Sequence, residues 1–454
     1  MGFLPQSSFS LPARHANPSE KKLMHSNRRT FLNRLSAAGS SLALPSLLTA
    51  QDKVAAGSGA SRKKIAFLGS VVRTHSHSQH FLDRLAMGYG WRGTWQEPRL
   101  EIASVFIDQF PDQTDLARQR VKKYGLKLYP GIEAALTLGT GKLAVDGVAI
   151  IAEHGDYPNN EKGQKLYPRY EWFKKCVKVF EASGRSVPVF NDKHLSTDWK
   201  ECVEMVEDSK RLNFPFFAGS SLPVTRRMPS LDMPHGVPLK ESVCVAYGGV
   251  DSYDIHALET AQCMSERRKG GEAGIKSVHA LRNEKLWEVL SRPERRDTRR
   301  LIRSALTRSH NLPVETGYYS GRIDFKWIRE QFANATGYLI EHLDGFQTTM
   351  LLVNIRDFNY AGLRADNNEV VSTQMYLPMP THGSSTADFF HPLCRHIEDC
   401  VLTGKVPYPA ERTLLTSGMV IAGVNSLHRG GVKIETPEMN IAYQVGKEST
   451  YWRD

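Results

Sequence analysis

Polar residues with functional chemistry follow each of four apolar runs in the first half of the chain. The runs are predicted strands and cover residues 63–70, 100–108, 145–152 and 186–191. The groups at their ends are Gly69 with Ser70, Asp108, Glu153 with His154, and Asp192 with Lys193. Parallel strands bring their carboxyl ends to one edge of a sheet, where such sheets bind ligands. We therefore expect these residues to form one site.

The turn after the first predicted strand is a degenerate dinucleotide loop. In a standard G-x-G-x-x-G loop, small residues let the backbone approach a pyrophosphate at a helix N-terminus. Here Val71 and Thr74 replace the second and third glycines, while Arg73 and Ser76 add side-chain donors for an anion. With these donors, the loop could still bind the phosphates of a nucleotide that is displaced from the standard position. The predicted cofactor-binding residues of the loop are Gly69, Ser70, Arg73 and Thr74.

Asp108 is placed to accept hydrogen bonds from the ribose hydroxyls of a dinucleotide. An acid there disfavours the extra phosphate of NADP. The expected cofactor is therefore NAD or NADP, and Asp108 favours NAD. The alternative is an acid that only ends a strand and caps the next turn.

Three histidines in the same turn support a second interpretation. His75-x-His77 with His80 follows the first strand, as in the metal-binding opening of amidohydrolase-type barrels. A metal-dependent hydrolase that uses His75 and His77 is therefore one alternative function. The further strand-end ligands do not occur at barrel spacing, so the pattern favours loop or helix-capping histidines and no metal.

The order of predicted elements indicates the fold class. Helical patterns at 80–87, 114–124, 131–138 and 171–183 alternate with the strands, which is typical of a Rossmann-like, doubly wound parallel sheet. From about Gly274 the pattern changes to two-residue alternation at 275–281, 337–343, 348–355 and 370–377. Alternation predicts a second, α+β domain with an open, mainly antiparallel sheet that has one buried face. The charge-rich segment Glu294–Arg303 is expected to be a solvated helix.

Several segments resemble the glucose-fructose oxidoreductase, inositol dehydrogenase and MocA family. The likeness lies in 108–151 (with K-Y-G and V-D-G-V-A-I), 179–194 (F-E-A-S-G-R-S-V-P-V-F-N-D-K-H), 248–256 (G-G-V-D-S-Y-D-I-H) and the helical tail 389–427. It covers most of residues 63–445, and each motif is degenerate. The resemblance implies an oxidoreductase that moves a hydride between a nicotinamide cofactor and a sugar, a polyol or a sugar derivative.

The resemblance also implies roles for two residues. Lys193 falls on the family's site lysine, which polarises or protonates the reacting oxygen, and beside a cationic nicotinamide it is expected to titrate low. His256 matches the histidine that acts as general base. Ser252 stands where the family has an aspartate, so Asp251 or Asp254 would have to assist. The alternatives are a solvated lysine and an ordinary histidine.

The segment after the third strand lies under the nicotinamide in the resembled family. Glu153 and His154 are therefore also predicted to bind the cofactor, and the aromatic and cationic groups that follow suit a sugar or a carboxylate. The predicted substrate-binding residues are Tyr157, Arg169, Asp192, His194 and Asp254.

Composition limits the classes of protein. The formal charge is +11, but residues 1–50 carry six basic residues and one acid, so the remainder carries +6 without a basic stripe. Nucleic acid is therefore not an expected partner. The chain has six cysteines and no C-x-x-C pair, so we expect neither a disulfide framework nor a zinc knuckle. Most of the cysteines should be buried.

The N-terminus resembles a twin-arginine export signal. Asn27-Arg28-Arg29-Thr30-Phe31-Leu32 precedes a mildly apolar run over 35–50 that is too short to span a bilayer. The alternative is a basic amphipathic helix or a tail. The signal predicts contact with the twin-arginine machinery, a periplasmic or otherwise exported location, and no stable membrane span after cleavage.

The expected organisation is a signal at 1–50, a linker at 51–62, a nucleotide-binding domain at 63–195 and a substrate and oligomerisation domain at 196–454. The C-terminal helices should return to the first domain, and a homo-oligomer is a further expectation from the resemblance. The expected function is an exported NAD(P)-dependent oxidoreductase. The main alternative keeps the fold but binds or processes a carbohydrate without redox chemistry, because the glycine loop is degenerate.

Overall fold

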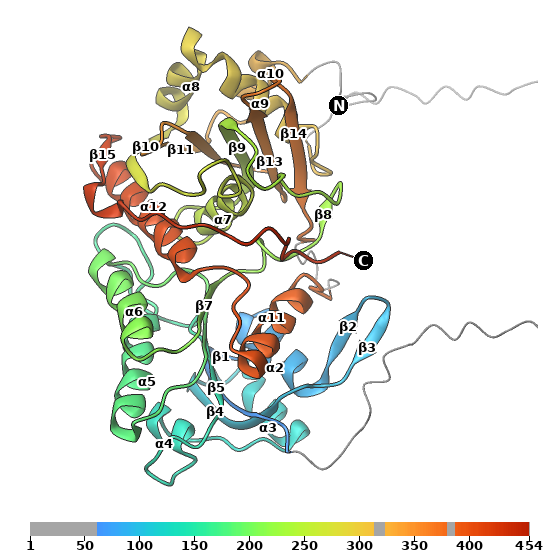
Figure 1. The fold of residues 1–454 in the computed structure, drawn as a ribbon, viewed down its shortest axis with the longest axis vertical. Coiled ribbons are helices and arrows are strands. Elements are labelled where there is room, and N and C mark those ends of the chain that lie inside the picture. The colour runs from blue at the N-terminus through green and yellow to red at the C-terminus, as the bar shows by residue number, and fades with distance from the viewer. Residues whose placement is uncertain (1–60, 313–322, 379–385, 454) are drawn as a thin grey trace, which may run out of the picture. The chain divides into compact units, whose positions relative to one another are not determined.

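A computed structural model describes residues 61–312, 323–378 and 386–453. The predicted signal and most of the predicted linker lie outside these residues. The described part forms one compact unit, drawn in Figure 1.

The first sheet is parallel and has the strand order β4-β1-β5-β6-β7. Its strands are β1 (Lys64–Val71), β4 (Glu101–Gln109), β5 (Gly147–Ile151), β6 (Val189–Asp192) and β7 (Phe216–Gly219). Leu68 on β1 pairs with Phe106 on β4 and with Ile150 on β5. The strand order reverses at β1, so the ligand crevice of such a sheet opens at the carboxyl ends of β1 and β5. The sequence pattern predicted four of these strands and not β7.

Helices cover both faces of this sheet. They are α2 (His77–Met87), α3 (Ala117–Tyr124), α4 (Ile132–Thr137), α5 (Arg169–Ser183) and α6 (Trp199–Arg211). Alternate side chains of β1 divide between two cores: Phe67 packs with Phe81 of α2, and Leu68 packs with Phe173 of α5. Figure 1 shows α5 and α6 side by side on the second face. Between α2 and β4 the chain forms a hairpin of β2 (Tyr89–Trp91) and β3 (Thr94–Gln96).

The second sheet has eight strands in the order β15-β10-β11-β12-β9-β13-β14-β8. They are β8 (Arg227–Met228), β9 (Leu239–Tyr247), β10 (Ile275–Arg282), β11 (Thr336–His342), β12 (Gln347–Val353), β13 (Phe358–Arg364), β14 (Val370–Met375) and β15 (Ile434–Glu435). β12 and β9 are parallel and the other pairs are antiparallel. The predicted mainly antiparallel sheet is therefore confirmed.

The expectation of a single buried face is wrong. One face of the second sheet packs on α7 (Asp254–Ser265) and α12 (Ala410–His428). The other face packs on α8 (Asn283–Ser291) and α9 (Arg296–Leu306), followed in the chain by α10 (Phe325–Gln331).

The two C-terminal helices contact elements of the first sheet and its helices. α11 (Phe390–Thr403) packs against α2. α12 contacts α6 and β7 as well as α7 and β10, so one helix holds elements of both sheets together.

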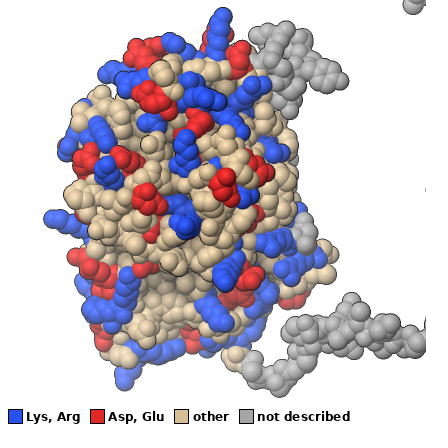
Figure 2. Space-filling view, turned by 45° about the horizontal axis from the view of Figure 1, so that its top comes forward, with Lys and Arg blue, Asp and Glu red and all other residues tan. Residues whose placement is uncertain are grey.

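Charged side chains of both signs are mixed on the surface. On the face shown in Figure 2, Lys and Arg side chains alternate with Asp and Glu side chains, without a continuous basic stripe.

All six cysteines are buried and unpaired, which confirms that they act as small apolar groups. Within the described ranges, no helix is long and apolar enough to cross a bilayer.

Candidate active site

A cavity of about 420 Å³ lies where the carboxyl ends of β1, β5 and β6 meet the start of α7. Its walls are Arg73, His75, His77, His80, Glu153, His154, Tyr167, Lys193, Ser221, Ser252, Tyr253, His256, Leu377, Phe389 and Phe390. Five of the residues predicted from the sequence are among them: Arg73, Glu153, His154, Lys193 and His256. Three of the five, Glu153, His154 and Lys193, belong to the strand ends that were expected to form one site.

Lys193 sits in a buried ion-pair network. Its Nζ atom lies 2.7 Å from Oε1 of Glu153 and donates to the carbonyl oxygen of Ser252 over 3.2 Å. Arg169 donates to the other oxygen of Glu153, so two cations share one carboxylate. All three side chains are buried. Lys193 and His154 each follow a strand with φ near +66° and +69°, which costs non-glycine residues energy and is often found at functional sites.

The network determines how Glu153 and Lys193 titrate. Burial alone would raise the pKa of the Glu153 carboxyl, but Lys193 and Arg169 hold it well below its usual range. Burial alone would lower the pKa of Lys193, but Glu153 raises it above the ordinary value. The buried carboxylate therefore stabilises the ammonium form of Lys193, and the expectation that this lysine titrates low beside a cationic nicotinamide stays a prediction.

His256 lies in the first turn of α7 with its ring buried at the cavity wall. Its Nδ1 atom is 2.8 Å from the hydroxyl oxygen of Ser220, so Nε2 is the ring nitrogen left for a ligand. Burial, together with Lys193, holds the pKa of His256 well below its usual value. The ring is therefore neutral at ordinary pH.

Neither flanking aspartate assists His256 directly. Asp251 accepts from the backbone N–H of Lys165 over 2.8 Å. Asp254 is fully buried and accepts from the Tyr338 hydroxyl over 2.9 Å, and burial raises its pKa to about 6. Both carboxylates thus form hydrogen bonds with other partners, and the side chain that contacts the His256 ring is Ser220.

The predicted cofactor residues outside the cavity wall have other contacts. Gly69 lies within β1, and the hydroxyl of Ser70 donates to the carbonyl oxygen of Glu153 over 2.6 Å, which ties β1 to β5. Thr74 is exposed. Asp108 is exposed at the end of β4 and accepts from the Tyr157 hydroxyl over 2.7 Å.

The backbone N–H groups at the start of α2 already donate hydrogen bonds to side chains of this protein. The Ser76 hydroxyl oxygen caps the helix and accepts from the N–H groups of Arg73 (3.1 Å) and Gln79 (3.2 Å). Nδ1 of His154 accepts from the N–H of His77 over 3.3 Å. A pyrophosphate would compete with these acceptors, so this turn is not the open amide cradle of a glycine loop.

The histidines of this turn are engaged separately. Nδ1 of His77 lies 2.6 Å from Oδ2 of Asp192, and the ring of His80 stacks on Phe390 at 4.8 Å. Burial lowers the pKa of His80 to about 2 and that of His154 to about 3. Among the described residues, no group of three potential ligands is arranged to hold a metal ion.

None of the five predicted substrate residues lines this cavity. Arg169 and His194 contact each other over 3.2 Å, and Nδ1 of His77 contacts Asp192. Tyr157 donates to Asp108, and Asp254 accepts from the N–H of Ile255 and from the Tyr338 hydroxyl. Two of them contact wall residues directly: Arg169 donates to Glu153, and Asp192 pairs with His77.

The sequence reasoning missed several wall residues and one deeper group. The aromatic wall of Tyr253, Phe389 and Phe390 gave no spacing signal, because Phe389 and Phe390 come from a distant part of the chain. Glu259, fully buried three residues after His256, accepts from the Ser220 hydroxyl and from the Ser220 N–H over 2.9 Å. Acid at three positions after a histidine on a helix is the only local hint of this contact.

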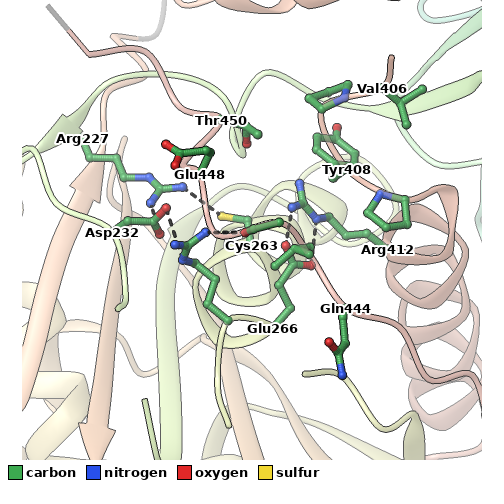
Figure 3. A pocket seen from close by; sticks show the side chains of 15 residues that line it. Arg227, Asp232, Cys263, Glu266, Val406, Tyr408, Arg412, Gln444, Glu448 and Thr450 are labelled. Carbon is green, nitrogen blue, oxygen red and sulfur yellow. Dashed lines mark hydrogen bonds and ion pairs between the residues drawn. The ribbon is translucent and has the colours of Figure 1, made fainter. Parts of the chain in front are cut away.

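A second cavity, of about 480 Å³, lies near the C-terminal segment (Figure 3). Its arginines are already paired: Arg227 with Asp232 at 2.6 Å, and Arg412 with both oxygens of Glu266. Because these charges satisfy one another, the first cavity remains the candidate active site.

Comparisons with known proteins bear on the fold. No family model matches the chain, and no curated protein sequence matches it. The solved structure of GenD2 from gentamicin A biosynthesis, in complex with NAD, is similar over 84% of this chain and 98% of its own, with 12% identity and a TM-score of 0.50. The chain has the fold of the glucose-fructose oxidoreductase, inositol dehydrogenase and MocA family.

Two further structures with this fold are similar to the chain. A putative myo-inositol dehydrogenase from Sinorhizobium meliloti 1021 covers 82% of this chain and 99% of its own at 11% identity, with a TM-score of 0.49. The myo-inositol dehydrogenase from Lactobacillus casei, in complex with NAD(H) and myo-inositol, covers 85% and 99% at 11% identity, with a TM-score of 0.48.

Proposed function

We propose that the protein is an NAD(P)-dependent oxidoreductase that acts on a sugar, a polyol or a sugar derivative. The observation that carries the proposal is that Lys193 and His256 line one cavity at the switch point of the parallel sheet. The shared fold with GenD2, crystallised with NAD, supports it.

The two side chains have complementary roles toward a substrate hydroxyl. The ammonium group of Lys193, kept charged by Glu153, donates a hydrogen bond to the reacting oxygen and stabilises negative charge there. Nε2 of His256 accepts the hydroxyl proton as a general base. Tyr167 and Tyr253 offer aromatic surface to a sugar ring at the wall.

The cofactor would be held by side chains more than by a glycine loop. The Arg73 guanidinium lines the cavity, and its contact with the Thr74 carbonyl oxygen is long, at 3.5 Å, so it is available to a phosphate. Asp108, exposed at the end of β4, would accept from the ribose hydroxyls once Tyr157 turns away, and its charge favours NAD over NADP. A bound nicotinamide would supply the hydride acceptor.

A specific observation favours one alternative. The acceptors at the start of α2, Ser76 and His154, occupy N–H groups that a pyrophosphate would need. A protein with this arrangement could bind a carbohydrate without a dinucleotide.

Native mass spectrometry of the purified protein, together with calorimetric titration with NAD and NADP, separates the two functions. The proposal expects a copurified dinucleotide or saturable binding of NAD. Absence of both, with binding of a sugar or polyol retained, would establish the non-redox alternative.

We also propose that the enzyme is exported through the twin-arginine route and works in the periplasm or outside the cell. The motif Asn27–Leu32 with its paired arginines supports this proposal. The route carries folded proteins, so a nucleotide could be loaded before export.

A further inference from the structure

A chain of hydrogen bonds leads from His256 into the protein interior. Nδ1 of His256 lies 2.8 Å from the Ser220 hydroxyl oxygen, and that hydroxyl contacts Oε2 of Glu259. The exposed fractions are 6% for His256, 1% for Ser220 and 0% for Glu259. Ser220 directly follows β7, and the other two residues are three positions apart on α7. The hydrogen bonds between these three side chains are therefore shielded from solvent.

The direction of each hydrogen bond follows from the donors present. An ionised carboxylate only accepts, and Oε1 of Glu259 already accepts from the Ser220 N–H over 2.9 Å. The single hydroxyl proton of Ser220 must then point to Oε2 of Glu259. The Ser220 oxygen accepts from His256, so His256 carries its proton on Nδ1 and presents the Nε2 lone pair to the cavity. This is the tautomer that a general base needs.

The surroundings favour a neutral His256 and a Glu259 that can take a proton. Burial and Lys193 disfavour the imidazolium form of His256 and lower its pKa. Burial raises the pKa of Glu259 to about 7, against the effect of its bonds to Ser220 and of Arg412 on α12, while Asp192 on β6 adds to the increase. The Tyr408 hydroxyl also lies close: a Cβ atom on Gly219 would be 2.5 Å from Oε1 of Glu259 and 2.6 Å from that hydroxyl. The backbone thus leaves room for Glu259 only because residue 219 is glycine.

We propose that Ser220 and Glu259 form a proton relay behind His256, so that a proton taken from the substrate ends on Glu259 while His256 stays neutral. The redox part of this inference rests on the proposed function. In that reaction the substrate C–H bond breaks and its hydride passes to NAD(P)⁺, and the O–H bond breaks and its proton passes to Nε2 of His256. The Nδ1 proton moves to Ser220, and the Ser220 proton moves to Glu259. Ser220 and Glu259 are positioning residues, because they act through His256.

The substitution Glu259→Gln tests the relay without any substrate. The Ser220 N–H keeps the amide oxygen in the place of Oε1, so the NH₂ group faces the Ser220 hydroxyl and can only donate to it. Ser220 must then donate to Nδ1 of His256, and the ring proton moves to Nε2. Nitrogen-15 NMR of histidine-labelled protein, with His256 assigned through its loss in His256→Gln, reports which ring nitrogen carries the proton.

Glu398 offers a matched control. It is 1% exposed and, like Glu259, accepts from one hydroxyl (Tyr89, 2.6 Å) and one backbone N–H (Arg99, 3.1 Å). Glu398→Gln should leave the His256 signals unchanged. The spectra are recorded above the pKa of Glu259, where its carboxylate is ionised.

The expected result is an Nδ1–H tautomer in the unaltered protein and an Nε2–H tautomer in Glu259→Gln. In Ser220→Ala the link is cut, so adding Glu259→Gln to that variant should change nothing further. An Nε2–H tautomer in the unaltered protein would overturn the relay even if Glu259→Gln fails to fold, and so would an unchanged tautomer in a folded Glu259→Gln. If the tautomer changes as expected and no sugar or polyol is oxidised, the proposed function fails and the relay stands.

Discussion

Lys193 and Glu153 form the central contact of the cavity, with 2.7 Å between Nζ and Oε1. Arg169 holds the second oxygen of the same carboxylate, and all three side chains are buried. One acid therefore compensates two cations in an environment that disfavours free charge. Removal of the acid is expected to affect both folding and the reacting lysine.

We predict that Glu153→Gln lowers the free energy of unfolding by about 3 to 5 kcal/mol, because it leaves two buried cations without an anion. The measurement is denaturant unfolding at neutral pH. Glu284→Gln is the control: Glu284 pairs with Arg329 at the surface, and such a pair contributes about 1 kcal/mol or less. Equal losses in the two variants would contradict the role assigned to the Glu153 network.

Lys193→Ala and His256→Ala are each expected to lower kcat by about 100-fold or more, since each removes a group that touches the reacting oxygen. Folding and any nucleotide binding should be largely kept. Steady-state kinetics with circular dichroism and NAD titration check this prediction. Nearly full activity in either folded variant would remove that residue from the mechanism.

The fold could be predicted from the sequence where apolar runs are continuous. The four predicted strands of the first sheet match β1, β4, β5 and β6 closely, because buried parallel strands are apolar on both faces. β7 is only four residues long, and the sequence of β9 begins with Leu, Lys and Glu, so neither had a clear period. In several strands of the second sheet, apolar and polar residues alternate. Helices α8 and α9 nevertheless bury the face that this alternation assigns to solvent.

The site could be predicted only to the level of strand ends. Lys193 and His256 lie on the cavity wall as the motif positions indicated. The contacts that determine their protonation are long-range: Glu153 is 40 positions from Lys193, and Ser220 is 36 positions from His256. No local spacing encodes such contacts, so the raised pKa of Lys193 and the relay behind His256 needed the three-dimensional structure.

Metal analysis of the purified protein is expected to find no stoichiometric zinc, iron or manganese. The physical reason is that, among the described residues, no three potential ligands lie close enough together to hold a metal ion, and the His80 ring stacks on Phe390. The measurement is elemental mass spectrometry after purification without chelators. One metal ion per chain, lost when His75 and His77 are both changed to alanine, would favour the hydrolase alternative.

The paired arginines of the N-terminal motif give a prediction about export. Replacing Arg28 and Arg29 with lysine keeps the charge but removes the side chains that define the motif, so the precursor should stay in the cytoplasm. Cell fractionation with immunoblotting measures the outcome, and Lys21 and Lys22 changed to arginine serve as the control. Unchanged export of the Arg28→Lys, Arg29→Lys protein would contradict the twin-arginine assignment.

Stability should fall in acid partly because of His80. Burial lowers the pKa of this histidine from its ordinary value of 6.5 to about 2, so between these values the unfolded chain binds a proton that the folded protein does not. Its contribution is present above pH 6.5 and is lost as the pH falls, at about 1.4 kcal/mol per pH unit. His80→Gln should reduce the slope of unfolding free energy against pH by that amount between about pH 6 and pH 4. Urea titrations at several pH values measure this slope, and equal slopes for His80→Gln and the unaltered protein would show that His80 takes up its proton in the folded state.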